Sequence, residues 1–243
     1  MKRTSVATIT LILAVAALAD PGVGAQQPAP AAPAAPPTPR AAAPIDLTGY
    51  WVSVVTEDWR WRMLTPPKGD YLSVPLNPEG RKTADTWDPA QAASNGCKPY
   101  GAAAVMRAPG RLHVTWDGDA TMKIETDAGQ QTRLLRFEAP KVPPAPSRQG
   151  LSIARWQGRA SLTVDTSRLI PGYLQTNGVP YSANATMEEH FDVVKEPNGE
   201  QWLIIDTIVT DPTYLFRTFV RSTHFKKEAD GSKWDPQPCI VKW

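Results

Sequence analysis

The stretch RLHVTWDGDATMKIETDAGQQTRLLRFE, residues 111–138, decides the fold. It contains three runs in which apolar and polar residues alternate, separated by Asp117-Gly118 and Ala128-Gly129. Alternation with a period of two indicates strands with one buried face, and short Gly-containing breaks are typical of hairpin turns. This stretch therefore predicts strands that follow one another as antiparallel hairpins.

Similar runs recur along most of the chain. Further strands are expected at 49–55, 58–63, 102–107, 151–156, 160–166, 185–194, 201–210 and 215–227. One helix is expected over 76–89, because Asn77 can cap its first turn and Pro78 fits that turn. We therefore predict a mainly β fold, an antiparallel up-and-down β-barrel of about ten strands with one short helix.

Residues 1–25 have the features of a secretory signal peptide. A basic start, Lys2-Arg3, precedes an apolar run over 6–19 that is too short to span a bilayer. Small residues at 23–25 fit cleavage after Ala25. We therefore expect an exported protein, periplasmic or secreted, whose mature chain has no integral membrane segment.

The segment 26–44 consists almost entirely of Pro and Ala and is expected to be an extended linker. Residues 45–243 then form a single β-barrel domain, because one hydrophobic core can serve a domain of this size. The formal net charge of the chain is +2, and its basic residues form no cluster. This charge pattern argues against nucleic acid as a partner.

Cys97 and Cys239 are the two cysteines of the chain. In an exported protein a single pair is expected to form a disulfide, and two free thiols are the alternative. Closing so long a loop is expected to stabilise the fold by about 4–5 kcal/mol. The bridge would hold the C-terminal tail against the middle of the chain.

Two resemblances follow from short motifs. DLTGYW (46–51) resembles the Gly-x-Trp opening strand of lipocalin-type barrels, which implies that Trp51 plugs the closed end of the barrel. The chain also resembles a group of uncharacterised secreted bacterial proteins with D-L-x-G-x-W, C-x-P-x-G, S-I-x-R-W and D-P motifs. These motifs are matched at 46–51, 97–101, 152–156 and 211–212. The second resemblance implies a shared fold and export, but no activity.

This chain departs from that group at Leu151 and Tyr181, where the group often has histidine. The departure argues against catalysis by histidine or by a metal. The three histidines of the chain, His113, His190 and His224, lie on separate expected strands without metal-ligand spacing. No G-x-S-x-G, phosphate-binding or dinucleotide-binding motif is present, so no metal or cofactor is expected.

Carboxylates are the candidates for catalysis: Glu125, Asp127, Asp165 and Glu189. Glu189 is in phase with Met187 and Phe191 and is therefore expected to be buried, where a carboxyl group can act as a general acid or base. Glu125 and Asp127 are expected to share one face of a strand, with Arg133 pairing across the hairpin. A solvent-exposed, salt-bridged strand face is the alternative.

Aromatic residues are the candidates for ligand binding, because the chain has nine tryptophans. In TEDWRWRM (56–63), alternation predicts Trp59, Trp61 and Met63 facing inward and Arg60 and Arg62 facing outward. The predicted ligand-binding residues are Trp59, Trp61, Arg133, Trp156, Tyr173 and Tyr181. The loop 171–182 is a candidate lid over the barrel mouth. The alternative is that these aromatic residues form the core and rim of the barrel and line no pocket.

Three functions are compatible with these features. The first is an exported lipocalin-like protein that binds a small apolar or aromatic molecule in a Trp-rich barrel. The second is a barrel enzyme, a lyase, isomerase or hydrolase, that uses buried carboxylates. The third is an envelope interaction module, with a filled barrel and an exposed apolar patch.

Overall fold

The computed structural model describes residues 36–91, 96–158 and 160–239. The predicted signal peptide and most of the predicted linker lie outside these residues. The described residues from Pro37 onward belong to one compact unit. The fold and the site described below belong to this unit.

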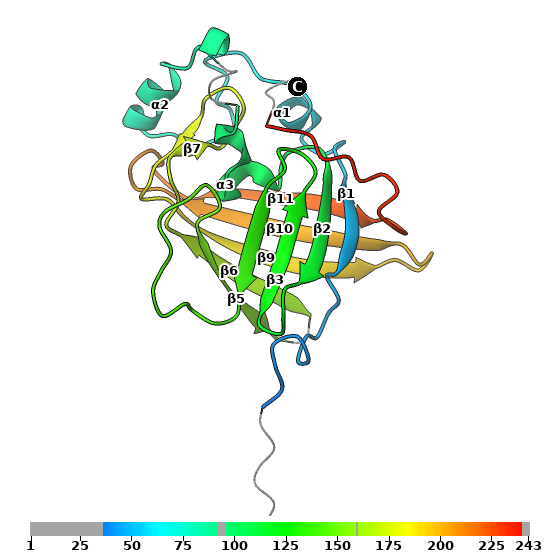
Figure 1. The fold of residues 1–243 in the computed structure, drawn as a ribbon. Coiled ribbons are helices and arrows are strands. Elements are labelled where there is room, and N and C mark those ends of the chain that lie inside the picture. The colour runs from blue at the N-terminus through cyan, green and yellow to red at the C-terminus, as the bar shows by residue number, and fades with distance from the viewer. Residues whose placement is uncertain (1–35, 92–95, 159, 240–243) are drawn as a thin grey trace, which may run out of the picture. The chain divides into compact units, whose positions relative to one another are not determined.

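Nine strands in the described part of the chain close into a barrel (Figure 1). They are β1 (Gly49–Ser53), β2 (Arg111–Trp116), β3 (Thr121–Thr126), β4 (Thr132–Arg136), β5 (Leu151–Gln157), β6 (Ser161–Ser167), β9 (Thr186–Lys195), β10 (Gln201–Thr210) and β11 (Phe219–Lys227). The strands pair in this order, and β11 closes onto β1. The prediction of a mainly β barrel is confirmed.

The barrel is mixed rather than purely antiparallel, because β4 and β5 pair in parallel. The Pro-rich segment between these two strands carries the chain back to the end of the barrel at which β4 began. The two strands therefore run in the same direction. The other neighbouring pairs of the barrel are antiparallel.

Side chains fill the interior of the barrel. Alternate residues along the strands are buried, as the period of two predicts. The buried interior includes Trp51, Leu112, Val114, Met122, Ile124, Leu135, Leu162, Val164, Phe191, Leu203, Ile205 and Phe225. Trp51 is wholly buried, and its indole nitrogen donates a hydrogen bond to the carbonyl oxygen of Leu47 at 2.9 Å. The barrel therefore has a packed core rather than the Trp-lined hollow that the first function requires.

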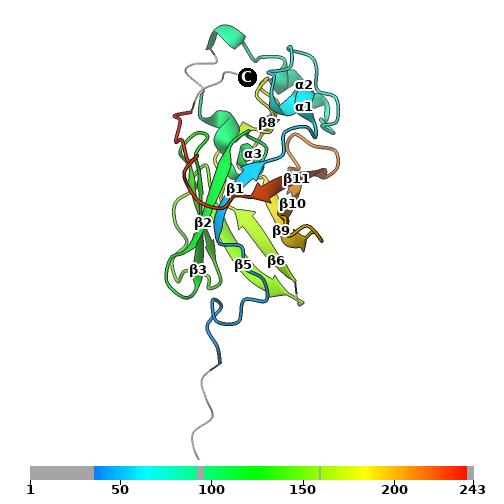
Figure 2. The same cartoon turned by 90° about the vertical axis from the view of Figure 1, so that its right-hand side faces the viewer.

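Short helices and one small hairpin cover one end of the barrel, which we call the capped end (Figures 1 and 2). They are α1 (Trp59–Arg62), α2 (Pro78–Ala84), α3 (Ala102–Val105) and the hairpin of β7 (Gly172–Tyr173) and β8 (Pro180–Tyr181). Leu174 and Val179 of this cover pack in one buried cluster with Met187, Val209 and Phe219 of the barrel strands. No helix in the described residues is long and apolar enough to cross a membrane.

The predicted helix over 76–89 is confirmed, in a shorter form, as α2. The side chain of Asn77 accepts a hydrogen bond from the backbone nitrogen of Gly80 at 2.8 Å, and Pro78 opens the helix. The predicted strand over 102–107 is wrong, because its alanines form the buried helix α3. Alanine has the highest intrinsic helix propensity, and the three alanines of α3 are all buried.

The predicted strand over 58–63 is also wrong, because these residues form the single-turn helix α1. Trp59 is 53% exposed, whereas Arg62 is only 3% exposed. The Arg62 guanidinium donates hydrogen bonds to the carbonyl oxygens of Val54 at 2.7 Å and Arg107 at 3.1 Å. The predicted orientation is therefore wrong for Trp59 and Arg62, whereas Arg60 is exposed as predicted and Trp61 and Met63 are half-buried.

An aromatic cluster lies at the end of the barrel away from the cap. It consists of Trp116, Phe137 and Trp156. The ring centroids of Trp116 and Phe137 are 5.6 Å apart, and those of Phe137 and Trp156 are 5.2 Å apart. The indole nitrogen of Trp156 also donates a hydrogen bond to the carbonyl oxygen of Pro39 at 2.8 Å. The last residues of the segment expected to be a linker are therefore held against the barrel.

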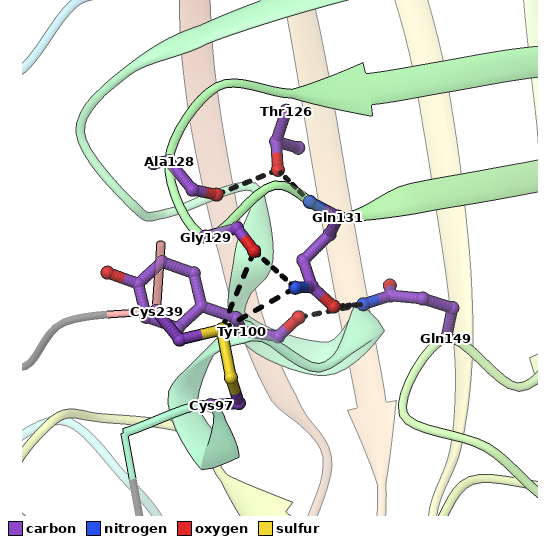
Figure 3. The surroundings of a disulfide bond; sticks show 8 residues. All are labelled: Cys97, Tyr100, Thr126, Ala128, Gly129, Gln131, Gln149 and Cys239. Carbon is purple, nitrogen blue, oxygen red and sulfur yellow. Dashed lines mark hydrogen bonds between the residues drawn. A yellow bond between two sulfur atoms is a disulfide. The ribbon is translucent and has the colours of Figure 1, made fainter. Parts of the chain in front are cut away.

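A disulfide joins Cys97 and Cys239, as predicted (Figure 3). Cys97 immediately precedes the short 3₁₀ helix η3 (Lys98–Tyr100). The side-chain nitrogen of Gln149 donates to the carbonyl oxygen of Tyr100 at 2.8 Å and to the side-chain oxygen of Gln131 at 3.0 Å. The bridge and these hydrogen bonds hold η3 and the C-terminal tail against the turn between β3 and β4.

Removing the disulfide is expected to lower the free energy of unfolding by about 3–5 kcal/mol, because the bridge spans 142 residues and restricts the unfolded chain. Urea unfolding of the Cys97→Ser/Cys239→Ser variant measures the loss. Each single variant should lose about the same amount, since either one opens the loop. A loss below about 1 kcal/mol would show that the tail is held by its other contacts.

Candidate functional site

A cleft of about 290 Å³ lies at the capped end between α2, η3 and the β7–β8 hairpin. We call it the aromatic cleft. Its lining residues are Thr83, Thr86, Trp87, Asp88, Gln91, Lys98, Pro171, Gly172, Tyr173, Gly178, Pro180, Tyr181 and Tyr214. Tyr173 and Tyr181 are two of the predicted ligand-binding residues, and the structure brings them together here.

Two glycines let aromatic rings pack directly on the backbone of the cleft. A Cβ atom on Gly178 would lie 2.3 Å from the Trp87 side chain, and Gly178 also has a φ of +84°. A Cβ atom on Gly172 would lie 2.4 Å from the Tyr181 hydroxyl oxygen. Larger residues at these positions would push the rings away, so the sequence PGYLQTNGVPYS shapes the wall of the cleft.

Lys98 brings a positive charge to the aromatic cleft. Its Nζ atom lies 5.0 Å from the ring centroid of Tyr173, which is a cation–π distance. Lys98 forms no ion pair with any carboxylate of the described residues. The neighbouring disulfide at Cys97 holds the backbone of η3, from which the Lys98 side chain extends.

Tyr181 adds a buried hydroxyl without a partner. The residue is 1% exposed, and its hydroxyl oxygen has no hydrogen-bond partner within the described residues. Burial raises the pKa of Tyr181 to about 12, against a smaller opposing effect of Arg148. The hydroxyl is therefore protonated at neutral pH and keeps an unused donor next to Gly172 of the cleft wall.

The other predicted ligand-binding residues lie elsewhere, so the predicted set is divided. Trp59 is exposed on α1, and Trp61 packs under the Arg60 guanidinium at 4.9 Å. Trp156 belongs to the aromatic cluster at the other end of the barrel. These three tryptophans do not line a common pocket, because α1 is a helix and carries two of them outside the barrel wall.

Arg133 and Glu189 form an ion pair inside the barrel. Both side chains are fully buried, with Nη1–Oε1 at 3.1 Å and Nη2–Oε2 at 2.6 Å. The hydroxyls of Ser152 and Thr166 lie 3.4 Å from Nη2. The expected burial of Glu189 is confirmed. Both oxygens of the Glu189 carboxylate therefore accept from Arg133 inside the packed core.

The expected pairing of Arg133 with Glu125 or Asp127 is wrong. Strand register places Thr132, not Arg133, opposite Glu125, so Arg133 faces the interior. Glu125 lies on the outer face and pairs with Lys123 at 3.0 Å. Asp127 is buried in the turn after β3, so the two carboxylates do not share a face.

Asp127 and Asp165 also have local partners. The Asp127 carboxylate accepts hydrogen bonds from the backbone nitrogens of Arg111 and Ala128, both at 2.6 Å. Burial raises the pKa of Asp127, although these hydrogen bonds act in the opposite direction. Asp165 is half exposed and pairs with Arg155 on the barrel wall. The four candidate carboxylates therefore do not form one site.

The three histidines lie on separate strands of the barrel, and His190 and His224 line one cleft. His113 pairs with Glu125, His190 with Glu188 and His224 with Glu57. The described residues contain no group of three His, Cys, Asp or Glu side chains that could hold a metal ion.

Sequence reasoning missed Trp87, Lys98 and Tyr214 of the aromatic cleft. Lys98 had a usable signal, since it follows a cysteine whose disulfide was expected. Trp87 and Tyr214 lie far apart in sequence and meet only because the cap folds over the barrel end.

Comparison with protein-family models, curated proteins and solved structures found no match. A function for this chain must therefore be argued from the geometry of the cleft.

Breaking the Arg133–Glu189 pair from one side is expected to destabilise the fold by about 3–5 kcal/mol, because the remaining charge stays buried without a partner. Arg133→Met and Glu189→Leu test this in urea unfolding. The double variant should lose less than either single variant, since it removes both charges. A double variant that loses the sum of the two would contradict this account.

Tyr181 is expected to make stability depend on alkaline pH. Its pKa of about 12 in the folded protein lies above the ordinary tyrosine pKa of 10.0, so the stability that this shift contributes is fully present below pH 10. It is lost as pH rises from 10 toward 12, because the unfolded chain loses its proton first. Unfolding of Tyr181→Phe should show a shallower alkaline decline than the wild-type protein. Equal slopes would mean that Tyr181 titrates normally.

Proposed function

We propose that this protein is an exported lipocalin-like barrel that binds a small aromatic molecule in the aromatic cleft. The observation that carries the proposal is the Lys98 ammonium above the Tyr173 ring, in a cleft that Tyr181 also lines. The chemistry of these groups suits a ligand with an aromatic ring and an anionic or hydrogen-bond-accepting group.

The size and lining of the cleft support this ligand class. Its volume of about 290 Å³ is near the lower end of the range for small-molecule sites, roughly 300–1,000 Å³. Trp87 and Tyr173 offer aromatic surface for ring packing. A ligand acceptor atom can bind Lys98 or Tyr181, which would satisfy the buried hydroxyl that the folded protein leaves without a partner.

The barrel interior supports a site outside the barrel rather than within it. Buried side chains and the Arg133–Glu189 pair occupy the space where a lipocalin-like ligand was first expected. The proposed enzyme alternative has less support, because each candidate carboxylate already has a local partner. A filled barrel also agrees with the interaction-module alternative. The experiment must therefore show whether a small aromatic molecule binds in the aromatic cleft.

Export is part of this proposal. Its support is the predicted signal peptide at 1–25 together with the disulfide between Cys97 and Cys239. Residues 26–243 are therefore the form of the chain to test.

The test uses 4-nitrobenzoate, a small aromatic anion, and nitrobenzene, its uncharged counterpart. Both quench tryptophan fluorescence, and Trp87 in the cleft wall reports on them. The Lys98→Met variant should weaken binding of 4-nitrobenzoate by about tenfold and leave nitrobenzene binding unchanged, since it removes only the charge. Tyr173→Ala should weaken both probes by about two- to tenfold, because it removes ring contact.

Tyr50→Ala is the matched control. Tyr50 lies on β1, where its ring stacks on His113 outside the cleft. This variant should bind both probes as the wild-type protein does. Absence of saturable binding, or an equal loss in Tyr50→Ala, would reject the proposed site and favour the interaction module.

A further inference from the structure

Three arginines converge around Asp58 at the capped end. Arg62 comes from α1, Arg107 follows α3, and Arg221 comes from β11. The Asp58 carboxylate lies 3.5 Å from Arg107 Nη2 and 3.8 Å from Arg221 Nε. We call Arg62, Arg107 and Arg221 the arginine cluster; α1 and α3 both belong to the cap in Figure 2.

The positive charge of the arginine cluster is only partly balanced by its surroundings, although Glu57 and Asp58 both attract Arg62. Asp58 is the one carboxylate of the described residues within ion-pair distance of any member, and its side chain is 40% exposed. Glu57 lies nearby but pairs with His224. Burial and, to a smaller extent, the charges of Arg221 and Arg62 lower the pKa of Arg107 to about 10, against the attraction of Asp58.

The cluster also has unused hydrogen-bond donors. Arg62 Nη2, Arg107 Nη1 and Arg221 Nε are buried and have no hydrogen-bond partner within the described residues. Arg62 and Arg107 are only 3% and 9% exposed. Leaving such donors buried and unpaired is costly, and the cost is largest for charged groups. A bound anion would offset both the charge and the missing hydrogen bonds.

Open space adjoins these donors on two sides of Arg62. A narrow cleft of about 30 Å³ is lined by Arg62, Arg107, Gln175 and Thr176, among others. The Gln175 amide and the Thr176 hydroxyl are also buried without partners in the described part of the chain. A wider cleft of about 620 Å³ is lined by Arg62 and Arg221, among others. Neither cleft shares a lining residue with the aromatic cleft.

We propose that the arginine cluster is a second binding site, for an oxyanion of the carboxylate or phosphate class. Guanidinium groups present paired donors that match the paired oxygens of these anions. The anion's charged group would occupy the narrow cleft beside Arg107 and Gln175. The wider cleft leaves room for the rest of a small organic molecule.

The test measures thermal unfolding with sodium phosphate or sodium acetate, at ionic strength matched with sodium chloride. A specific anion raises Tm in proportion to its occupancy, because it binds only the folded protein. Arg107→Met should weaken binding by about tenfold or more, since it removes a charged donor. Asp58→Asn should tighten binding, because it removes the competing carboxylate. Asparagine also tolerates the left-handed backbone of Asp58, whose φ is 52°.

Arg60→Met is the matched control on the same helix. Arg60 is exposed and pairs with Asp70 outside the cluster, so its loss should leave the anion response unchanged. A phosphate response alone identifies a phosphoryl group, and an acetate response alone identifies a carboxylate.

Several results would overturn the proposal. One is a Tm response to phosphate and acetate no larger than to chloride. Another is an equal loss of response in Arg107→Met and Arg60→Met, which would indicate a general salt effect. If Arg107→Met does not fold, Asp58→Asn decides, and an unchanged or weaker anion response in that variant rejects the site.

Discussion

Pairing of β11 with β1 closes the barrel, and the rest of the structure depends on this closure. Trp51 of β1 lies opposite Lys227 on one side and Leu112 of β2 on the other. Closure leaves no free edge in the barrel wall and turns one face of every strand inward. Because the inward side chains fill the enclosed space, ligand chemistry can be built only at the ends or on the outside of the barrel.

The capped end is where the chain places such chemistry. Its segments are short and irregular, but they are fixed to the barrel by a buried cluster and by the disulfide at Cys97. A rigid scaffold that positions irregular segments is a common basis for binding sites in proteins. Here it brings Lys98 of η3 to Tyr173 of β7, although the two residues are far apart in sequence.

Sequence patterns predicted the barrel because strand alternation is a local property. Most of the barrel strands, the turn after Asp117, and the cap at Asn77 could be predicted from short stretches of sequence. The disulfide was predicted from two cysteines in a chain that was expected to be exported. Helix α1 could not be predicted in this way, because the burial of Arg62 depends on carbonyls of Val54 and Arg107.

The Arg133–Glu189 pair also shows which features a local sequence pattern predicts and which depend on strands that are distant in sequence. The phase of Glu189 relative to Met187 and Phe191 predicted its burial. Its partner Arg133 was assigned to the neighbouring hairpin, because the sequence does not show that β4 and β9 face each other across the barrel. The same limit explains why Tyr173 and Tyr181 were predicted for the site while Trp59 and Trp156, which lie elsewhere, were predicted with them.

The distribution of charge separates the capped end from the barrel wall. On the wall, cations have adjacent carboxylates, as in Arg155–Asp165 and Lys226–Glu200. At the capped end, Lys98 has no carboxylate partner in the described residues, and the arginine cluster shares Asp58. A formal net charge of +2 conceals this difference. Because paired wall charges largely cancel at a distance, the two proposed anion sites depend on these cations of the capped end.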